Sequence, residues 1–412
     1  MILKNRTLLL LIAIIFTQAA NGQSITYAKR VIKDLCTDEM AGRGYVDDGV
    51  NKAANYLGSE FRKLGLKKFN YSFFQNFEFP INTFPYSVKA TLDGKSLQVG
   101  KDFLLSPTSG PCNGDYKLIH FNLKDSIEAE LYDKKLQLGL DRNEAFVITN
   151  KPKDMSVDLY PISIKVLKSK MMNGLRPTAN DGCELIFPDS IISNADSLFI
   201  NAQNKEIKDF KSKNVIGYLP ACKKKNRNKF IVFTAHYDHL GKMGDAVFPG
   251  ASDNASGTAM VLNLAKHYAK SKNKYSMVFI LFAGEEAGLL GSKYFTEHPT
   301  FNIDNIKMLV NLDIMGSAEN GVTVVNATEY PQQFSTLQRI NKKKNYLPKV
   351  KSRGPTSNSD HYFFYKRGIP SFFIYSMGGP GFYHDIYDTP ESIPMKNYNN
   401  IFRLLTDFVA TF

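Results

Sequence analysis

Cysteine is scarce in this sequence, and its spacing excludes a cysteine-based zinc knuckle. The 412 residues contain four cysteines, Cys36, Cys112, Cys183 and Cys222, and no two of them form a CxxC pair. In an exported protein they could form one or two disulfides, and unpaired buried thiols are the alternative. We therefore expect the chemistry of the protein to lie elsewhere.

Internal repeats, low-complexity tracts and long apolar runs beyond the N-terminus are also absent. With 43% apolar and 22% charged residues, the composition is that of an ordinary globular protein. It argues against a disordered, collagen-like or many-span membrane protein. A chain of 412 residues exceeds the length at which a single core usually stops growing. We therefore expect two domains, or one large domain with an insertion.

The N-terminus combines two cationic side chains, a short apolar run and a small-residue end in MILKNRTLLLLIAIIFTQAANGQ. This pattern predicts a secretory signal peptide over residues 1–22, cut after Gly22. The protein is then exported, to the periplasm or the medium, with no stable membrane insertion after cleavage. An uncleaved anchor is the alternative, but the apolar run is shorter than a membrane span needs. No cysteine follows the cut to carry a lipid.

The net charge of +13 comes from many dispersed lysines. The densest basic runs, at 222–229 and 341–345, lie between predicted elements and are typical of solvated loops. Nucleic-acid binding would require a basic face with stacking aromatic residues. We expect no nucleic-acid partner.

Four continuous apolar runs in the second half of the chain predict strands of a parallel sheet. They are KFIVFTA (229–235), SMVFILFA (276–283), IKMLVNL (306–312) and IPSFFIYS (369–376). Such runs are expected of strands that are buried on both faces. The segment between the first two, 256–270, has apolar residues at helical spacing. This alternation of strand and helix is typical of an α/β fold.

The first half of the chain is organised differently. Apolar residues at helical spacing predict one amphipathic helix within 37–66. From 76 to 205, short β-rich runs such as YKLIHFNL and CELIF alternate with turn residues, which predicts an inserted β-rich subdomain. We therefore assign 23–75 and 206–412 to one domain and 76–205 to the insertion.

Polar side chains stand at the ends of three of the apolar strands. The first strand runs into His236, the second leads into Glu285 and Glu286, and the third ends at Asp313. In open α/β sheets, ligands bind beyond the carboxyl ends of the strands, so these groups should converge in one crevice. Glu285 and Glu286 cannot point the same way, which fits one base and one ligand, but their spacing does not say which is which.

Two loops add further candidate ligands. Asp253 lies in GASDNASG just before a predicted helix, and His384 lies in GFYHDIYDTPESI after the fourth strand. Histidines and carboxylates without cysteine form a ligand set suited to Zn²⁺, with Mn²⁺ or Co²⁺ as possible substitutes. A catalytic zinc normally has three protein ligands. Five or six candidates therefore indicate two metal ions that share a carboxylate.

Five motifs in this order resemble the family of co-catalytic di-zinc aminopeptidases that includes bacterial leucyl aminopeptidases and glutamate carboxypeptidase. They are AHYDHLG, SDNASG, AGEEAGLLGS, NLDIMG and YHDIYDTP. The resemblance implies a mixed, mostly parallel central sheet flanked by helices, the zinc exopeptidase fold. In many members of this family a protease-associated domain takes the place of the insertion, and ELYDKKLQLGLDRNEAFVITN (130–150) loosely resembles its helix-then-strand unit. We expect the insertion to shape or cover the substrate entrance.

The resemblance also implies which residues bind metal. Asp253 would bridge the two zinc ions. His236 and Asp313 would complete one site, and Glu286 and His384 would complete the other.

Catalytic and supporting roles follow from the same resemblance. Glu285 would be the general base, Tyr383 would donate to the tetrahedral oxyanion, and Asp238 would orient a ligand histidine. The peptide bond between Asp253 and Asn254 would be cis. We expect the conspicuous His239 neither to bind a metal nor to orient a ligand.

A second grouping, NSDHYFF (358–364), invites interpretation as a catalytic triad. Ser359, Asp360 and His361 are neighbours in sequence and cannot easily form the required chain of hydrogen bonds. The family resemblance instead places this segment beside the substrate pocket. The histidines outside every motif are expected to be packing or surface residues: His120, His267 and His298.

Together these features predict an exported zinc exopeptidase that removes N-terminal residues from peptides. A carboxylate-rich rim would attract the free α-amino group of the substrate. Glutaminyl cyclisation and carboxypeptidase action on acidic peptides are alternatives on the same fold. A non-catalytic receptor or scaffold is a further alternative, which the complete ligand set argues against. The side-chain preference and the oligomeric state are not predicted.

Overall fold

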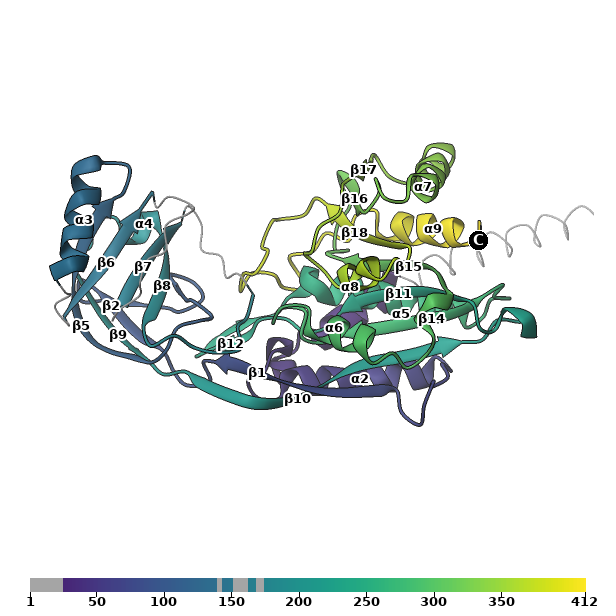
Figure 1. Ribbon diagram of the computed structural model, residues 1–412, viewed down its shortest axis with the longest axis horizontal. Helices are drawn as coiled ribbons and strands as arrows, with labels where there is room; N and C mark the ends of the chain where they lie inside the picture. Colours follow the sequence, from purple (N-terminus) through teal and green to yellow (C-terminus); the bar gives the residue numbers. More distant parts are fainter. Residues whose placement is uncertain (1–24, 139–142, 151–161, 168–173) are drawn as a thin grey trace, which may run out of the picture.

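The computed structural model describes residues 25–138, 143–150, 162–167 and 174–412. The expected signal peptide, residues 1–22, lies outside the described residues. The chain forms two lobes that are joined by the long strands β1 and β10 (Figure 1). No helix in the described ranges is long and apolar enough to cross a membrane.

The larger lobe is built on an eight-stranded mixed sheet. In spatial order its strands are β1 (Phe74–Thr83), β10 (Lys205–Leu219), β14 (Ser276–Phe282), β11 (Phe230–His236), β15 (Ile306–Asp313), β18 (Ser371–Met377), β16 (Gly321–Val325) and β17 (Val350–Ser352). The central strands β14, β11, β15 and β18 are parallel, whereas β1, β10 and β16 pair antiparallel. The predicted α/β class and mostly parallel central sheet are confirmed.

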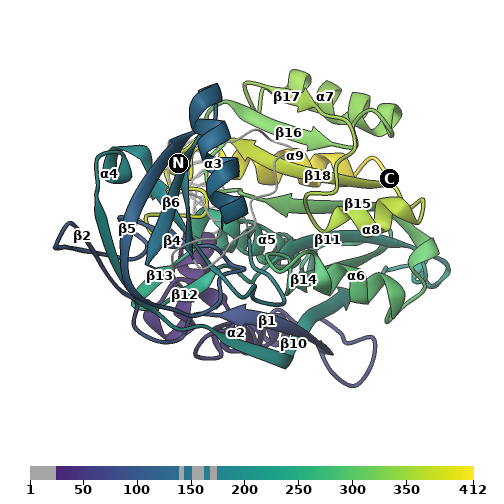
Figure 2. The ribbon, with the colours of Figure 1, turned by 60° about the vertical axis from the view of Figure 1, so that its left-hand side comes forward.

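Helices cover both faces of this sheet (Figure 2). One face carries α2 (Gly49–Lys63), α5 (Gly257–Tyr268), α7 (Pro331–Lys344) and α9 (Tyr398–Val409), and the other carries α6 (Leu290–Glu297) and α8 (His361–Lys366). Alternate residues of β11 pack into the cores on opposite faces of the sheet. Phe233 stacks on Tyr268 of α5, whereas Val232 belongs to the core beneath α6 and α8. Burial on both faces explains why the strand is apolar throughout.

The smaller lobe is a second eight-stranded sheet. In spatial order its strands are β3 (Lys95–Leu97), β2 (Lys89–Leu92), β9 (Ser197–Ala202), β5 (Cys112–Asn122), β6 (Glu144–Thr149), β7 (Ile162–Leu167), β8 (Cys183–Pro188) and β4 (Leu104–Leu105), with the helices α3 (Ser126–Leu138) and α4 (Asp189–Ile192). The strands from β5 to β8 are parallel. This sheet lies within the expected insertion, but the expected boundary at residue 76 falls inside β1, which pairs with β10 in the main sheet.

All four cysteines carry free thiols. Cys112 and Cys183 stand at the first positions of β5 and β8, where both are buried and their Sγ atoms are 2.8 Å apart. Cys36 is partly buried and Cys222 is exposed. The thiols of Cys112 and Cys183 therefore lie side by side, unlike those of the other two cysteines.

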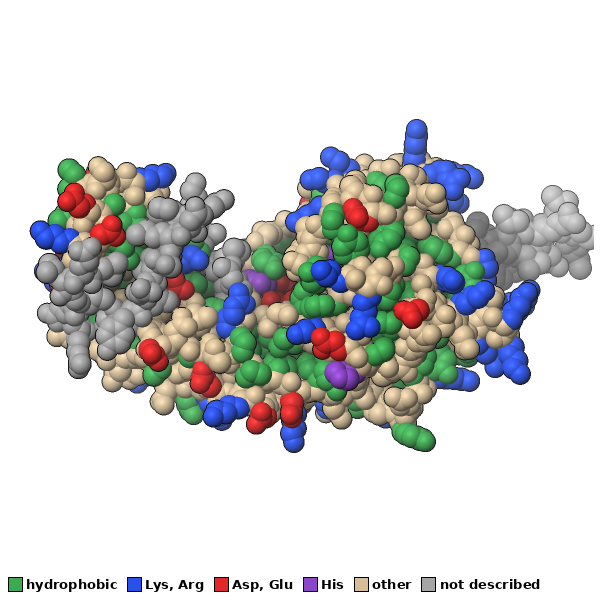
Figure 3. Space-filling model, viewed as in Figure 1, with side chains coloured by type: hydrophobic (Ala, Val, Ile, Leu, Met, Phe, Trp, Pro, Cys, Tyr) green, Lys and Arg blue, Asp and Glu red, His purple; other side chains and the backbone are tan. Residues whose placement is uncertain are grey.

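A hollow separates the two lobes on the face shown in Figure 3, and acidic side chains and a histidine are visible in it. A short hairpin of β12 (Gly241–Met243) and β13 (Ala246–Phe248) follows β11 on the same side of the larger lobe. The carboxyl ends of the central parallel strands point toward this side (Figure 1).

Candidate metal centre

Three parallel strands bring the first site residues to one edge of the main sheet. β11 ends at His236, β15 ends at Asp313, and Glu285 and Glu286 follow β14. His236 Nε2 lies 3.4 Å from Asp313 Oδ2. The residues converge because neighbouring parallel strands end side by side.

Asp253 lies between two histidines. It belongs to the loop Ala251–Ser256 that leads into α5, and its peptide bond to Asn254 is cis, as the family resemblance implies. Asp253 Oδ1 is 3.3 Å from His236 Nε2, and Asp253 Oδ2 is 3.2 Å from His384 Nε2. Each carboxylate oxygen therefore faces a different histidine, which is the arrangement that a bridging ligand needs.

The donors form two groups that share Asp253. One contains His236 and Asp313. The other contains Glu286 and His384, whose Oε2 and Nε2 atoms are 3.2 Å apart, and His239 also lies within reach of Asp253 and Glu286. Donors separated in this way can both lie about 2 Å from one ion, the usual length of zinc–nitrogen and zinc–oxygen bonds. Asp313 Oδ1 is buried and has no hydrogen-bond partner among the described residues, as expected of an atom that completes a cation site. The donor set and its geometry fit zinc.

Burial and opposite charges set the proton affinities in this cluster. Burial alone would lower the pKa of His384, but Glu286 and Asp253 outweigh it and raise that pKa to about 11. Burial would raise the pKa of Glu286, but His384 and His239 hold it at about 2. The pKa of His236 is also raised well above its ordinary value, because nearby carboxylates outweigh burial. Zinc ions would have to displace the protons of these histidines.

Glu285 has the opposite shift. Burial raises the pKa of its carboxyl group well above the ordinary value, and repulsion from Glu286, Asp360 and Asp313 adds to this effect, while His236 opposes it. The side chain is only partly buried. A carboxyl group whose pKa is raised beside a cluster of donors is suited to proton transfer.

Asp238 supports both glutamates through their main chain. Its carboxylate accepts the N–H groups of Glu285 and Glu286, each at 3.3 Å, and the hydroxyl of Tyr45 at 2.9 Å. His236 Nδ1 is 3.8 Å from the Asp238 carboxylate and 3.2 Å from the Asp238 main-chain oxygen. Asp238 therefore lies beside His236 as expected, but its carboxylate mainly holds the two glutamates, which the sequence did not predict.

His239 lies closer to the centre than expected. Its Nδ1 atom is 2.9 Å from Glu286 Oε1 and 4.0 Å from Asp253 Oδ2, and the ring is fully buried. The expectation that His239 does not orient a ligand is wrong, because this contact restricts the Glu286 carboxylate. The spacing of AHYDHLG could not reveal it, since Glu286 is distant in sequence.

Two further supporting residues were missed. Asp388 accepts the main-chain N–H groups of Ser252 and Asp253, at 2.8 and 3.0 Å, and so holds the loop that carries Asp253. Arg43 is fully buried and donates to main-chain carbonyl groups around the same loop, including Gly250 O at 2.6 Å. Asp388 lies in the motif YHDIYDTP, which was its only signal in the sequence, whereas Arg43 lies outside the five motifs.

The Ser359 hydroxyl forms hydrogen bonds to neighbours other than His361. The Ser359 hydroxyl accepts from Asn311 Nδ2 at 2.8 Å and donates to Asp313 Oδ2 at 3.4 Å. Burial lowers the pKa of His361 to about 4 and raises the pKa of Asp360 to about 7. Ser359 therefore supports a candidate metal ligand.

Tyr383 covers one face of His384. The two rings are stacked with centroids 3.8 Å apart, and Tyr383 is 49% exposed. Desolvation, and then the charges of Asp253 and Glu286, raise its pKa, so the hydroxyl group stays protonated and can donate. Phe382, on the same loop, is also exposed. This loop forms an aromatic rim next to the candidate ligands.

The histidines outside the motifs pack against other parts of the chain, as expected. Their partners are the Ala195 carbonyl for His120, Phe402 for His267 and Tyr294 for His298.

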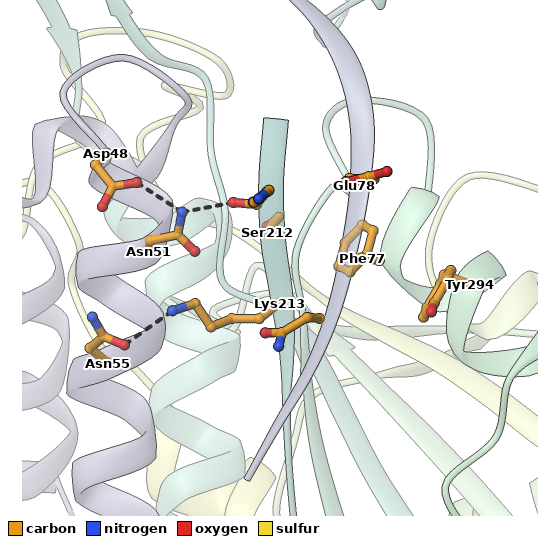
Figure 4. Close-up of a pocket in the computed structure, with 10 residues that line it drawn as sticks. Asp48, Asn51, Asn55, Phe77, Glu78, Ser212, Lys213 and Tyr294 are labelled. Carbon is orange, nitrogen blue, oxygen red and sulfur yellow. Dashed lines mark hydrogen bonds between the residues drawn. The ribbon is translucent and has the colours of Figure 1, made fainter. Parts of the chain in front are cut away.

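A separate polar pocket of about 690 Å³ lies between α2, β1, β10 and α6 (Figure 4). Asn51 donates to Asp48 and to the Lys211 carbonyl in this pocket, and Lys213 donates to Asn55. The described residues that line it include no histidine, no cysteine and none of the candidate ligands. The pocket is therefore distinct from the candidate metal centre.

Sequence comparison finds similar proteins for the second half of the chain. The model of peptidase family M28 matches residues 214–409. A probable leucine aminopeptidase of Arthroderma otae is 27% identical over 179 residues, which cover 40% of this chain and 46% of that protein. A probable zinc metalloprotease of Pyrenophora tritici-repentis is 39% identical over 103 residues, 23% of each chain. The matches thus span less than half the length of these curated relatives.

Solved structures share the fold over nearly the whole chain. A zinc aminopeptidase from Bacillus subtilis has a TM-score of 0.66 and 19% identity, with 94% of each chain covered. An aminopeptidase from Aneurinibacillus sp. strain AM-1 has a TM-score of 0.64 and 21% identity, with 94% of this chain and 93% of that chain covered. The residues of the donor cluster all lie within the matched segment. All five motifs lie within residues 214–409, the segment that matches the model of peptidase family M28, and the resemblance predicted from those motifs is confirmed.

Proposed function

We propose that the chain is a zinc-dependent aminopeptidase that uses two zinc ions. The observation that carries this proposal is the position of Asp253, which presents one oxygen to His236 and the other to His384. His236 and Asp313 would complete one site, and Glu286 and His384 the other. Mn²⁺ or Co²⁺ could replace zinc in a site of this composition.

Zinc held by these residues would supply Lewis-acid chemistry, which polarises a scissile carbonyl group and lowers the pKa of a water molecule. Glu285 would take a proton from the attacking water and deliver it to the leaving amine. Asp238 holds the main chain of Glu285 for this task. The Tyr383 hydroxyl would donate to the tetrahedral oxyanion. Hydrolysis then proceeds without a covalent intermediate on the protein.

The charge and shape of the centre favour a peptide with a free N-terminus. Several carboxylates lie together at the centre, among them Asp253, Glu285 and Asp313, and they attract an ammonium group. The exposed aromatic rim at Phe382 and Tyr383 offers apolar contact to the substrate. The names of the fungal relatives, a zinc metalloprotease and a leucine aminopeptidase, support the same activity.

We also infer that the protein is exported. The support is the charged, apolar and small-residue pattern of residues 1–22. Mass spectrometry of protein from the native host should find a mature chain that begins after Gly22. A mature chain that still contains the apolar run would contradict cleavage.

A substrate panel tests the proposed activity. We expect hydrolysis of aminoacyl-anilides with a free amino group, and little hydrolysis of the same compounds after N-acetylation. Peptides with N-terminal glutamine should be cleaved rather than cyclised, and an acidic C-terminal residue should not be released. Cyclisation alone, or release of C-terminal residues alone, would overturn the assignment as an aminopeptidase.

A further inference from the structure

We propose that the inserted lobe positions the candidate zinc ligand Glu286 through residues 174–176, here called the strap. The strap lies between β7 and β8 in the chain and reaches the edge of the main sheet, where it contacts the main chain of Glu286. The inference rests on the proposed function in one respect, namely that Glu286 is a zinc ligand.

The strap completes the hydrogen bonding of Glu286. The Leu175 N–H group donates to the Glu286 carbonyl at 2.6 Å, while the Glu286 N–H group donates to Asp238 at 3.3 Å. The main chain of Glu286 is therefore held on one side by the larger lobe and on the other by the insertion. Its side chain contacts His239 and His384, so a rotation of the main chain would move both carboxylate oxygens.

The strap is itself anchored to the main sheet. The Asn82 N–H group, near the end of β1, donates to the Arg176 carbonyl at 2.9 Å. The buried Asn82 side chain donates to the carbonyl groups of Pro107 and Ser109 and accepts from Asn204. These contacts connect β1, the insertion and Glu286 in one network, so the strap has little freedom to move away from the centre.

Close packing requires glycine at the first strap position. Gly174 has a φ of +68°, and a Cβ atom there would lie 2.6 Å from the Glu286 carbonyl oxygen. Leu175 is buried and lines a small cavity together with Tyr45, the residue whose hydroxyl holds Asp238. The strap thus contacts both Glu286 and the residues that support it.

These contacts make the strap a set of positioning residues. Its main chain acts on a metal ligand and does not reach the reacting atoms. Loss of an outer contact to a metal ligand typically weakens metal affinity or activity by about 10- to 100-fold. The zinc affinity of the site that contains Glu286 should therefore depend on the insertion.

The first test is Gly174→Ala, with Gly94→Ala as the matched control. Gly94 also lies in the insertion and has a φ of +77°, but a Cβ atom there would meet no described residue within 4 Å. Both substitutions place alanine at a positive φ, so both should reduce the stability of the folded chain by a similar amount. Only Gly174→Ala also displaces the Glu286 carbonyl group. In chelator competition we expect about 10-fold weaker retention of one zinc ion in Gly174→Ala. The control should match the wild type, and kcat should fall in Gly174→Ala with little change in KM.

Hydrogen exchange on the wild-type chain gives a second test that does not depend on a variant folding. Because coupling between two sites is reciprocal, zinc should slow exchange in a peptide that contains Leu175 and leave the turn around Gly94 unchanged. Unchanged exchange at the strap, or equal zinc retention in the two glycine variants, would overturn the proposal. A chain that binds zinc in this strap-dependent manner but cleaves no peptide would overturn the proposed function alone. A chain that binds no zinc would overturn both.

Discussion

The two sheets of this chain contribute to the candidate metal centre in different ways. The main sheet supplies side chains, because its parallel strands end together at His236, Asp313 and the pair Glu285 and Glu286. The described part of the insertion supplies no side chain to the donor cluster, and it contributes main-chain contacts through residues 174–176. One sheet therefore carries the candidate ligands, while the other helps to hold one of them in place.

The strands of the two sheets also differ in how completely their residues are buried. Every residue of β11 and β14 is buried, which matches strands covered by helices on both faces. In β5, buried and exposed positions alternate over much of the strand. A separate small core of Phe121, Tyr132 and Phe146 lies between this sheet and α3. One face of β5 is therefore more exposed to solvent than either face of β11 or β14.

The largest effect is expected from Glu285→Gln. Removal of a general base should lower kcat by roughly 10²–10⁴-fold. The zinc content should not change, since Glu285 is not a proposed ligand. Steady-state kinetics and metal analysis on the same preparation check both points. Glu297→Gln, at an exposed position on α6, is the control, and undiminished activity of Glu285→Gln would remove Glu285 from this role.

A pair of histidine variants compares the two lobes directly. His236→Ala should lose about one zinc equivalent and most activity, because a catalytic zinc depends on each of its few ligands. His120→Ala, in the insertion, should keep its zinc, since the His120 ring bonds to the main-chain carbonyl group of Ala195 and is not a member of the donor cluster. Equal zinc content in the two variants would contradict the assignment of His236.

The stabilising effect of zinc should grow as the pH rises. In the zinc-free chain the pKa of His384 is raised to about 11, from an ordinary value of about 6.5. A histidine with a raised pKa contributes its full stabilisation to the folded zinc-free chain when the pH is below the ordinary pKa. This contribution is lost as the pH rises toward the raised pKa. Zinc binds the neutral imidazole, so its affinity increases as the pH rises over the same range. The difference in Tm between zinc-loaded and zinc-free protein should therefore widen from pH 6.5 to 9, and a constant difference would argue against His384 as a ligand.

The smallest effect is expected from Tyr45→Phe. The change removes one buried hydrogen bond to Asp238, which should lower the free energy of unfolding by about 1 kcal/mol. Zinc retention should weaken slightly, because Asp238 holds the main chain of both glutamates. Denaturant unfolding checks the first point and chelator competition the second. Tyr86→Phe, at a half-exposed position, serves as the control and should change neither.

Much of the main sheet and the donor set could be predicted from the sequence. Buried parallel strands leave continuous apolar runs, and the polar residues at their ends mark the edge where ligands bind. His236 and Asp313 were found in this way. The separate roles of Glu285 and Glu286 came only from the family resemblance, and they remain predictions. The spacing of two adjacent glutamates carries no information on which one points at a metal.

The supporting contacts could not be predicted because they join distant positions through main-chain atoms. Tyr45 and Asp238 are 193 positions apart, and Asp388 holds a loop 135 positions away through N–H groups that every residue possesses. The strap meets Glu286 in the same way, through the Leu175 N–H group. Contacts of this kind depend on the path of the chain in space and leave no periodicity or motif.

The number of zinc ions bound per chain shows whether Asp253 is shared by two metal sites at the edge of the main sheet. Metal analysis of the dialysed wild-type chain should find about two zinc ions per chain, and Asp253→Ala should lose most of both, because each site loses a ligand. A single zinc ion in the wild type, or two retained in Asp253→Ala, would contradict the shared carboxylate.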